Sequence, residues 1–143
     1  MRTYAAIAAT VLLAGCGGPS DDQPDDAPIS LPAGVPTKQL SRAERELATA
    51  YRTFVDAFLS GEGATAYDLL SERCQGVYSP EEYVDGSADA AEDFGLVDYV
   101  IVSVTVNGDT GEVDGEFPVA ELNHDGGTAF VLEDGKWRAD RCE

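Results

Sequence analysis

Four residues near the N-terminus, Leu13-Ala14-Gly15-Cys16, place a reactive side chain in a specific local context. The thiolate of a cysteine is a strong nucleophile and can accept a glyceryl or acyl group. Small residues directly before the cysteine are typical of a site where a signal peptidase cuts an exported chain. The chemistry that this spacing predicts is therefore covalent lipid attachment at Cys16, followed by cleavage of the peptide bond before it.

The segment before this box has the features of an export signal. Arg2 supplies a positive charge, and the apolar run that ends at Leu13 is roughly half as long as a membrane-spanning helix. The box itself resembles the cleavage site of bacterial lipoprotein signal peptides at every position. An ordinary signal peptide with an incidental cysteine is the alternative. We expect residues 1–15 to be a lipoprotein signal peptide, and Cys16 to anchor the mature chain to the extracytoplasmic face of the cell membrane.

The chain is strongly acidic, with 27 Asp and Glu against 9 Lys and Arg and a net charge of −18. Such a surface repels nucleic-acid phosphates, which argues against a nucleic-acid partner. It also repels anionic lipid headgroups, so the acyl chains rather than a basic patch are expected to hold the protein at the membrane. A solubility role for the acidic residues is the simpler interpretation of their number.

Residues 16–40 are predicted to be the lipidated cysteine and a disordered linker. The segment is rich in Pro, Gly and Asp, which cannot build a core and which repel one another. Specific cation binding by its carboxylates is not favoured, because a disordered chain offers no fixed ligand geometry. Residues 41–143 remain, about the length of one domain.

Cys74 and Cys142 are the two cysteines left after lipidation of Cys16. Outside the cytoplasm such a pair usually forms a disulfide, and closing a loop of this length would stabilise the fold by about 4 kcal/mol. Two free buried thiols are the alternative. No histidine or other cysteine lies close to either residue in the sequence, so neither a metal site nor any cofactor is predicted.

Two well-marked helices are predicted. The first begins at a capping box formed by Ser41 and Glu44, carries apolar residues at helical spacing, and stops at Gly61. The other spans 79–95 and opens with Ser-Pro-Glu-Glu, in which the serine caps, the proline suits the first turn and the glutamates favour the positive end of the helix dipole.

A shorter helix is predicted between these two. Thr65 and Asp68 form a weaker capping pair, and the helix is expected to run into Cys74 and to break at Gly76. This gives three helices in the first half of the predicted domain.

From residue 97 the apolar pattern changes to that of strands. Residues 97–106 are β-branched and apolar on both faces at their start, which favours a central strand. In the next strand, 112–119, Pro118 removes one ladder donor, so this strand is expected at an edge or with a bulge. The carboxylates of this strand are expected to face away from its apolar residues: Glu112, Asp114 and Glu116. Its acidic, glycine-rich turn lacks the register of a calcium loop.

Two further strands, 128–133 and 136–142, are joined by a two-residue Asp-Gly turn. This register places Leu132 opposite Trp137. Strict alternation would put Cys142 on the face opposite Trp137, so the predicted disulfide requires a bulge or a strong twist near the end of the chain.

Three helices followed by an antiparallel sheet of about four strands indicate an α+β fold. With the Phe54/Phe58 helix, the Asp134-Gly135-Lys136-Trp137 turn and the placement of Cys74 and Cys142, this order resembles the nuclear-transport-factor-2-like superfamily. It is most similar to the small domains of that type in actinobacterial lipoproteins. The resemblance covers 41–143 and implies a curved sheet that wraps the helices into a cone with a pocket at its mouth.

Enzymes of that superfamily place Asp, His or Tyr inside the cone, but this sequence offers few candidates. His124 lies in an Asn-His-Asp-Gly-Gly turn and Asp56 lies off the apolar stripe, so both are expected in solvent and no catalytic residue is assigned. Aromatic residues are the candidate pocket lining, although side chains of this kind also form plain core. They are Tyr51, Phe54, Phe58, Tyr67, Tyr83, Tyr99, Phe117 and Trp137.

The sequence therefore predicts a membrane-anchored, extracytoplasmic, non-catalytic module that binds a small apolar ligand or an envelope protein partner. The alternative is a small-molecule lyase or isomerase that uses the cone pocket, which requires a buried carboxylate or histidine with a shifted pKa. A third interpretation, a purely structural module, predicts a filled cone and an exposed apolar patch.

Overall fold

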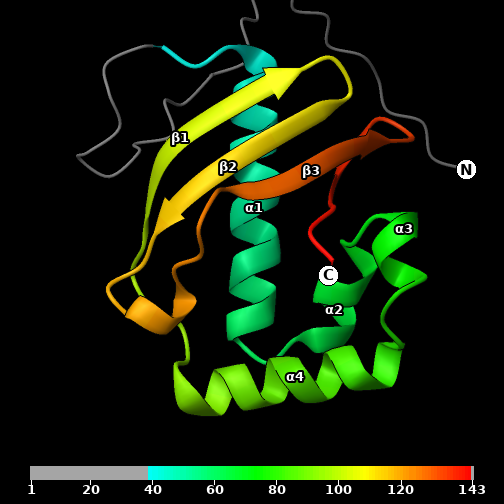
Figure 1. Ribbon diagram of the computed structural model, residues 1–143, viewed down its shortest axis with the longest axis vertical. Helices are drawn as coiled ribbons and strands as arrows, with labels where there is room; N and C mark the ends of the chain where they lie inside the picture. The colour runs from blue at the N-terminus through cyan, green and yellow to red at the C-terminus, as the bar shows by residue number, and fades with distance from the viewer. Residues whose placement is uncertain (1–38, 143) are drawn as a thin grey trace, which may run out of the picture.

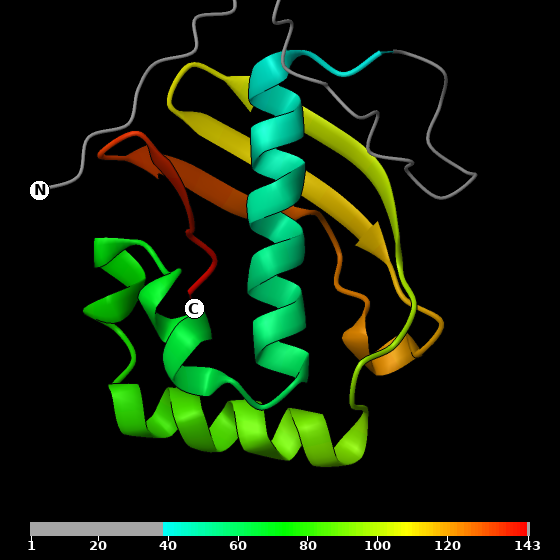
Figure 2. The ribbon, with the colours of Figure 1, turned by 180° about the vertical axis from the view of Figure 1, so that it is seen from behind.

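Helices cover one face of a four-stranded antiparallel sheet in the computed structural model, which describes residues 39–142. Helix α1 (Arg42–Leu59) runs along that face, and α4 (Pro80–Asp93) crosses below the C-terminal end of α1 (Figure 1). The view from behind shows the same face with α1 in front of the sheet (Figure 2). The predicted α+β fold class is confirmed. The predicted signal peptide, Cys16 and most of the linker lie outside the described residues, and within the described part no helix is long and apolar enough to cross a membrane.

Helix α1 has the predicted start and end. Ser41 Oγ accepts a hydrogen bond from the Glu44 N–H, and the Glu44 carboxylate accepts one from the Ser41 N–H, which completes the capping box. Gly61 follows the helix with φ +80°, a left-handed conformation that glycine adopts without strain. The buried positions repeat with helical spacing and pack against the sheet: Leu47, Ala48, Tyr51, Val55, Ala57 and Leu59.

The predicted second helix is wrong in detail, because the structure divides it into α2 (Gly63–Asp68) and α3 (Glu72–Gln75). Thr65 and Asp68 do not cap α2, whose N-cap is Glu62 without a side-chain bond. Between the two helices Leu70 forms a parallel bridge with Ala139 at the end of the sheet. The backbone there bonds to a strand instead of continuing the helix, and Ser71 caps α3.

Helix α4 begins with the second predicted capping box, formed by Ser79 and Glu82, with Pro80 in the first turn. It ends at Asp93, and Gly95 follows with φ +62°. The helix packs closely on α2, because the missing side chain of Gly63 lets the two backbones approach. A Cβ atom at that position would lie 2.6 Å from the Val84 Cα.

The sheet is a meander of β1 (Val100–Asn107), β2 (Thr110–Glu116), β3 (Thr128–Glu133) and β4 (Lys136–Ala139), in that order. The prediction that the first strand is central is wrong, since β1 lies at an edge. Its start is apolar on both faces for another reason. The bulge at Val102 leaves that side chain exposed, while Ile101 is buried under α1.

Pro118 also has a different place from the one predicted. Strand β2 is internal and regular, and the extra residue belongs to its partner β1, between Ile101 and Ser103. Strand β2 ends at Glu116, so Pro118 removes no ladder bond. The chain then turns through a short 3-10 helix, Ala120–Leu122, before β3.

The β3–β4 hairpin has the predicted register, with Leu132 opposite Trp137. The disulfide between Cys74 and Cys142 is also confirmed, with a Cα–Cα distance of 5.3 Å. Strict alternation would have put Cys142 on the face opposite Trp137, but β4 ends at Ala139. The residues after it, including Cys142, therefore need not follow the alternation of the strand.

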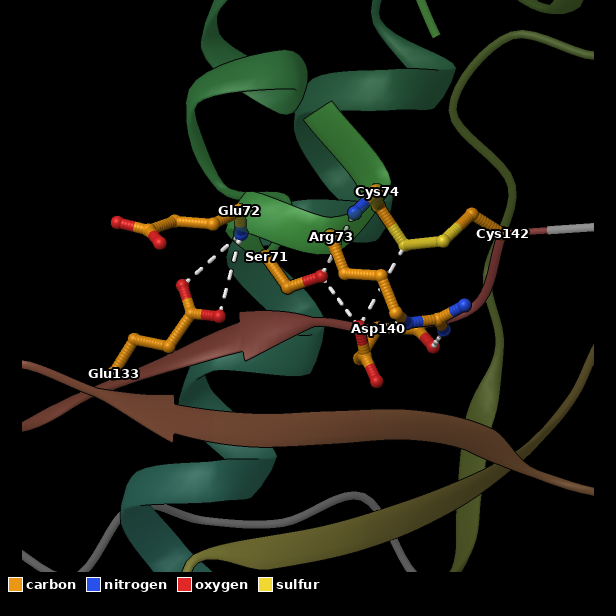
Figure 3. Close-up of polar contacts among 7 residues, drawn as sticks. All are labelled: Ser71, Glu72, Arg73, Cys74, Glu133, Asp140 and Cys142. Atoms are coloured by element: carbon orange, nitrogen blue, oxygen red, sulfur yellow. Dashed lines mark hydrogen bonds and ion pairs between the residues drawn. A yellow bond between two sulfur atoms is a disulfide. The ribbon is translucent and has the colours of Figure 1, made fainter. Parts of the chain in front are cut away.

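The end of the chain is fastened to α3 by more than the disulfide (Figure 3). Ser71 Oγ donates to the Asp140 carboxylate, with 2.5 Å between the oxygens, and Arg73 Nε donates to the same carboxylate at 3.1 Å. A second Arg73 nitrogen donates to the Asp140 carbonyl at 2.7 Å. The segment after β4 therefore has a defined path.

Candidate functional site

An aromatic cavity of about 190 Å³ lies between α1, α4 and the sheet-forming half of the chain. Five aromatic side chains line it: Tyr51, Phe54, Phe58, Tyr83 and Phe117. The lining also includes the exposed residues His124 and Gly126 and the half-buried Arg141, which bonds to the Gly126 carbonyl, and we call the part of the lining that these three residues form the mouth. The arrangement combines an apolar interior with a polar opening.

Helix α1 supplies most of the aromatic wall. Tyr51, Phe54 and Phe58 lie on one face because their spacing of three and four residues follows the helical repeat. Tyr83, in the first turns of α4, meets Phe58 with ring centroids 5.5 Å apart. Phe130 of β3 supports this wall from the sheet; its ring centroid lies 6.4 Å from that of Phe54, in an edge-to-face arrangement. Rings held in this way are fixed in position before a ligand enters.

Gly115 makes space for the Tyr51 ring. A Cβ atom at position 115 would collide with the Tyr51 hydroxyl, so the strand can pass this ring only without a side chain. Burial, followed by the charge of the nearby Asp114 carboxylate, raises the pKa of Tyr51 to about 12. Burial also raises the pKa of Tyr83. Both phenols therefore stay neutral near pH 7, and neither makes a hydrogen bond to another described residue, so both can donate to a ligand.

The other three predicted lining residues do not reach the cavity. Tyr67 packs behind Tyr83 and donates its hydroxyl to the carbonyls of Gln75 and Tyr78. Trp137 is buried in the core opposite Leu132. Five of the eight predicted side chains therefore share the cavity, and their role in binding stays a prediction.

Tyr99 is the third predicted lining residue that does not reach the cavity, and it lies in a separate open groove of about 1140 Å³. Its hydroxyl donates to the Asp56 carboxylate at 3.1 Å, and the Arg52 guanidinium lies 5.9 Å from its ring centroid. Burial, followed by the Asp56 charge and hydrogen bond, raises the pKa of Tyr99. One Arg52 nitrogen is buried and has no hydrogen-bond partner among the described residues. We call this the acidic groove, because its lining includes four carboxylates: Asp56, Glu62, Asp98 and Glu116.

The mouth contains one residue that the sequence placed in a surface turn, His124, and one that the sequence did not indicate, Arg141. His124 is exposed in its turn, as expected, yet it also borders the cavity. Arg141 was not singled out. Its place beyond the end of β4 is set by the contacts of Asp140 and Cys142 with α3, so strand periodicity gives no signal for it.

The charge of the cavity differs from that of the chain as a whole. Its lining includes no Asp or Glu, although the chain has 27 of them. Glu112 and Glu116 are exposed, and Asp114 is half-buried on the sheet face that points away from α1. The predicted outward orientation of these three carboxylates agrees with the strand register, so the interior keeps a neutral lining with one cation at its mouth.

Cys74, Asp140 and Cys142 form a cluster whose candidate ligand atoms lie within 4.8 Å of one another. Both sulfur atoms belong to the disulfide, and the carboxylate receives hydrogen bonds from Ser71 and Arg73 (Figure 3). Disulfide sulfurs are poor metal ligands because the thiolate is the form that binds. We therefore assign the oxidised cluster a structural role.

Comparison with solved structures gives the fold. An NTF2-like (nuclear-transport-factor-2-like) protein of Campylobacter jejuni, named a candidate transpeptidase, matches with a TM-score of 0.52 and 15% identity, over 66% of this chain and 97% of that chain. An NTF2-like protein of unknown function from Silicibacter pomeroyi matches with a TM-score of 0.50 and 21% identity, over 70% and 93%.

The chain thus has an NTF2-like α+β fold, as the sequence resemblance implied. No protein-family profile matches the chain, and no curated protein sequence matches it significantly. Both structural matches have sequence identities below a quarter, so they indicate the fold but not the activity. The function therefore has to be argued from the site.

Proposed function

We propose that this protein is a lipid-anchored extracytoplasmic binding module whose aromatic cavity holds a small apolar ligand. The observation that carries the proposal is the cavity itself, lined by five aromatic side chains and free of carboxylates. An apolar cavity of about 150 Å³ in another protein binds benzene, so about 190 Å³ suits a ligand of one ring or similar size.

The proposed anchor rests on Leu13-Ala14-Gly15-Cys16 and on the acidic, proline-rich segment that separates Cys16 from α1. A tether of this composition would hold the domain away from the bilayer, because its charges repel one another and the acidic surface. The acyl chains then supply the membrane affinity.

Cys16→Ser tests the anchor. In a bacterial host that processes lipoproteins, we expect the wild-type chain to incorporate labelled fatty acid and to enter the detergent phase. The serine variant should do neither, while Cys74→Ser together with Cys142→Ser, as the control, should keep the label. Label in the Cys16→Ser chain would refute the anchor.

The small-molecule lyase or isomerase remains the alternative for the same cavity. Such an enzyme needs a buried acid or base, whereas His124 at the mouth is exposed and the lining includes no carboxylate. The groups there whose pKa is shifted are tyrosines raised by burial, which favours donation of hydrogen bonds over proton abstraction. These features support binding without catalysis.

Native mass spectrometry of the mature protein, extracted gently from the envelope, tests the ligand. We expect an added mass beyond the lipid that is released on unfolding. Narrowing the cavity with Phe54→Trp should remove that mass, while Val77→Trp, at an exposed position away from the lining, should keep it. The absence of any added mass on both the wild type and Val77→Trp would argue against the cavity as a binding site.

A protein partner is the second candidate, favoured by the free edge of the sheet. Among the described residues β1 pairs with β2 alone; Val100 and Val102 on β1 are exposed, as is Leu96 shortly before it. Leu96 and Val100 also border the acidic groove. An extended segment with apolar and Lys or Arg side chains would complement this edge. A photo-cross-linking residue in place of Val102 should then yield a specific adduct in the envelope, whereas one in place of Glu81 on α4 should not.

A further inference from the structure

We propose that the ligand of the aromatic cavity is an anion, a carboxylate carried on a single ring or a group of that size, which pairs with Arg141 at the mouth. This inference rests on the proposed function and makes it specific. The ring would occupy the space among Tyr51, Phe58 and Phe117, and the carboxylate would lie at the guanidinium. It makes Arg141 the specificity-determining residue.

Charge is the first argument. In a chain of net charge −18, the cavity lining has no carboxylate and one arginine, while the acidic groove has four carboxylates around Arg52. The molecule as a whole repels anions, so a carboxylate ligand requires a local cation, and Arg141 is the arginine in the cavity lining that can supply it. A cationic ligand would have to approach Arg141 against repulsion at short range.

The free donors of Arg141 are the second argument. A guanidinium has five N–H donors, and the one hydrogen bond that Arg141 makes to another described residue is to the Gly126 carbonyl, at a long 3.4 Å. Unlike Arg42 and Arg73, which pair with Glu46 and Asp140, it forms no ion pair with a described residue. The remaining donors can bind a carboxylate in the bidentate geometry that arginine favours.

The third argument is that Arg141 is held in place from both sides. The preceding residue, Asp140, is engaged by Ser71 and Arg73, and its N–H donates to the Ala129 carbonyl at 2.8 Å. The following residue, Cys142, is joined to Cys74 (Figure 3). A backbone fixed at both neighbours loses little further freedom when the side chain binds, which favours affinity.

The interior adds donors suited to the same group. Tyr51 and Tyr83 line the cavity, and their neutral hydroxyls have no hydrogen-bond partner within residues 39–142. They can donate to a carboxylate oxygen or to a second polar group on the ligand. A neutral hydrocarbon would use none of these donors.

Four ring compounds of similar size test the proposal by titration against the full chain carrying Cys16→Ser: toluene, benzoate, phenylacetate and benzylamine. We expect benzoate or phenylacetate to bind about tenfold or more tightly than toluene, and benzylamine to bind least tightly. The readout is the shift of protein NMR signals with ligand concentration. Tightest binding by toluene or benzylamine would overturn the proposal.

Arg141→Gln should reduce the affinity for the carboxylates about tenfold or more and leave toluene binding unchanged. Arg42→Gln is the matched control, because it removes the same charge from an exposed position on α1 and should change neither affinity. Equal carboxylate affinity in wild type and Arg141→Gln would refute the role of Arg141.

The neutral amide benzamide gives a measurement on the unmodified cavity, in case Arg141→Gln does not fold. Benzoate should bind more tightly than benzamide, because only the carboxylate can form an ion pair with the guanidinium, while equal affinity of the two would refute the proposal. The proposed function fails in a different way. If toluene binds and the carboxylates bind no more tightly, only the proposal of an anionic ligand fails. If none of the four compounds binds, the proposal that the cavity holds a small ligand fails.

Discussion

At the scale of single residues, Gly115 decides whether the cavity exists in its present form. Its missing side chain leaves room for the Tyr51 hydroxyl, and Tyr51 in turn forms part of the aromatic wall. Tyr51 is only 2% exposed and its ring is rigid, so it cannot move aside easily. A small change at this position should therefore alter stability and cavity shape together.

Gly115→Ala should destabilise the fold by about 1–3 kcal/mol, because the new methyl group overlaps the Tyr51 ring. Urea unfolding followed by circular dichroism measures the effect. Adding Tyr51→Phe should recover part of the loss by removing the hydroxyl. As the control, Gly86→Ala in α4 meets no atom within 4 Å and should stabilise by about 0.5–1 kcal/mol. Equal effects of the two alanines would contradict this account.

Tyr51 also predicts an alkaline pH dependence. Its pKa rises from the ordinary 10.0 to about 12 on folding, so between these values the unfolded chain has lost a proton that the folded chain keeps. Stability contributed by the neutral phenol is therefore complete below pH 10 and falls as the pH rises towards 12. Unfolding midpoints measured from pH 9 to 11.5 should fall less steeply in Tyr51→Phe. An unchanged slope in that variant would exclude Tyr51 as a contributor.

At the scale of elements, α3 and the end of β4 form one unit. Ser71 is fully buried, caps α3 by accepting from the Cys74 N–H at 3.1 Å, and donates to Asp140. The bridge between Leu70 and Ala139 adds backbone bonds, and the disulfide closes the assembly. This unit fixes the segment that carries Arg141, so its integrity matters for the mouth as well as for stability.

Loss of the disulfide should cost about 4 kcal/mol of stability, because Cys74 and Cys142 are 68 residues apart and their bond restricts a long loop of the unfolded chain. Chemical unfolding of Cys74→Ala/Cys142→Ala against the wild type measures this. Reductant should weaken the wild type and leave the double variant unaffected. A mass increase of about two units on reduction of the wild type checks that the bond is present.

At the scale of the whole molecule, negative charge dominates. The net charge is −18, and within the described residues only two ion pairs among described partners are resolved, Arg42–Glu46 and Arg73–Asp140. Carboxylates surround the acidic groove and the solvent face of β2, so the folded chain repels itself. The aromatic cavity is the neutral exception, which is why its one arginine is informative.

Salt should therefore stabilise the fold. Raising NaCl from about 10 to 150 mM shortens the Debye length from about 30 to 8 Å and screens repulsion between distant carboxylates. We expect the Tm to rise over this range, as measured by differential scanning calorimetry. Sucrose at matched osmolality should not produce the same rise in Tm, because it does not screen charge. A Tm that falls with salt would mean that attractive pairs outweigh the repulsion.

Local chemistry in the sequence determined much of the fold. The capping serines at positions 41 and 79 satisfy backbone donors within their own helix turns, so their pattern predicts both helix starts. The Asp-Gly turn sets the register of the β3–β4 hairpin for the same local reason. The count and context of the cysteines were enough to predict the disulfide. The lipid anchor stays a sequence prediction, since residues 1–38 lie outside the described part.

Only the tertiary structure decided the features that depend on contacts between distant segments. The break between α2 and α3 follows from the pairing of Leu70 with Ala139, and the edge position of β1 follows from the strand order. Periodicity shows which aromatic side chains face inward, but not that Trp137 fills the core while Phe117 borders a space. The position of Arg141 at the mouth depends on where β4 ends, and the contacts of Asp140 and Cys142 with α3 fix that end. Such contacts leave no local period in the sequence, because each partner is chosen by packing in three dimensions.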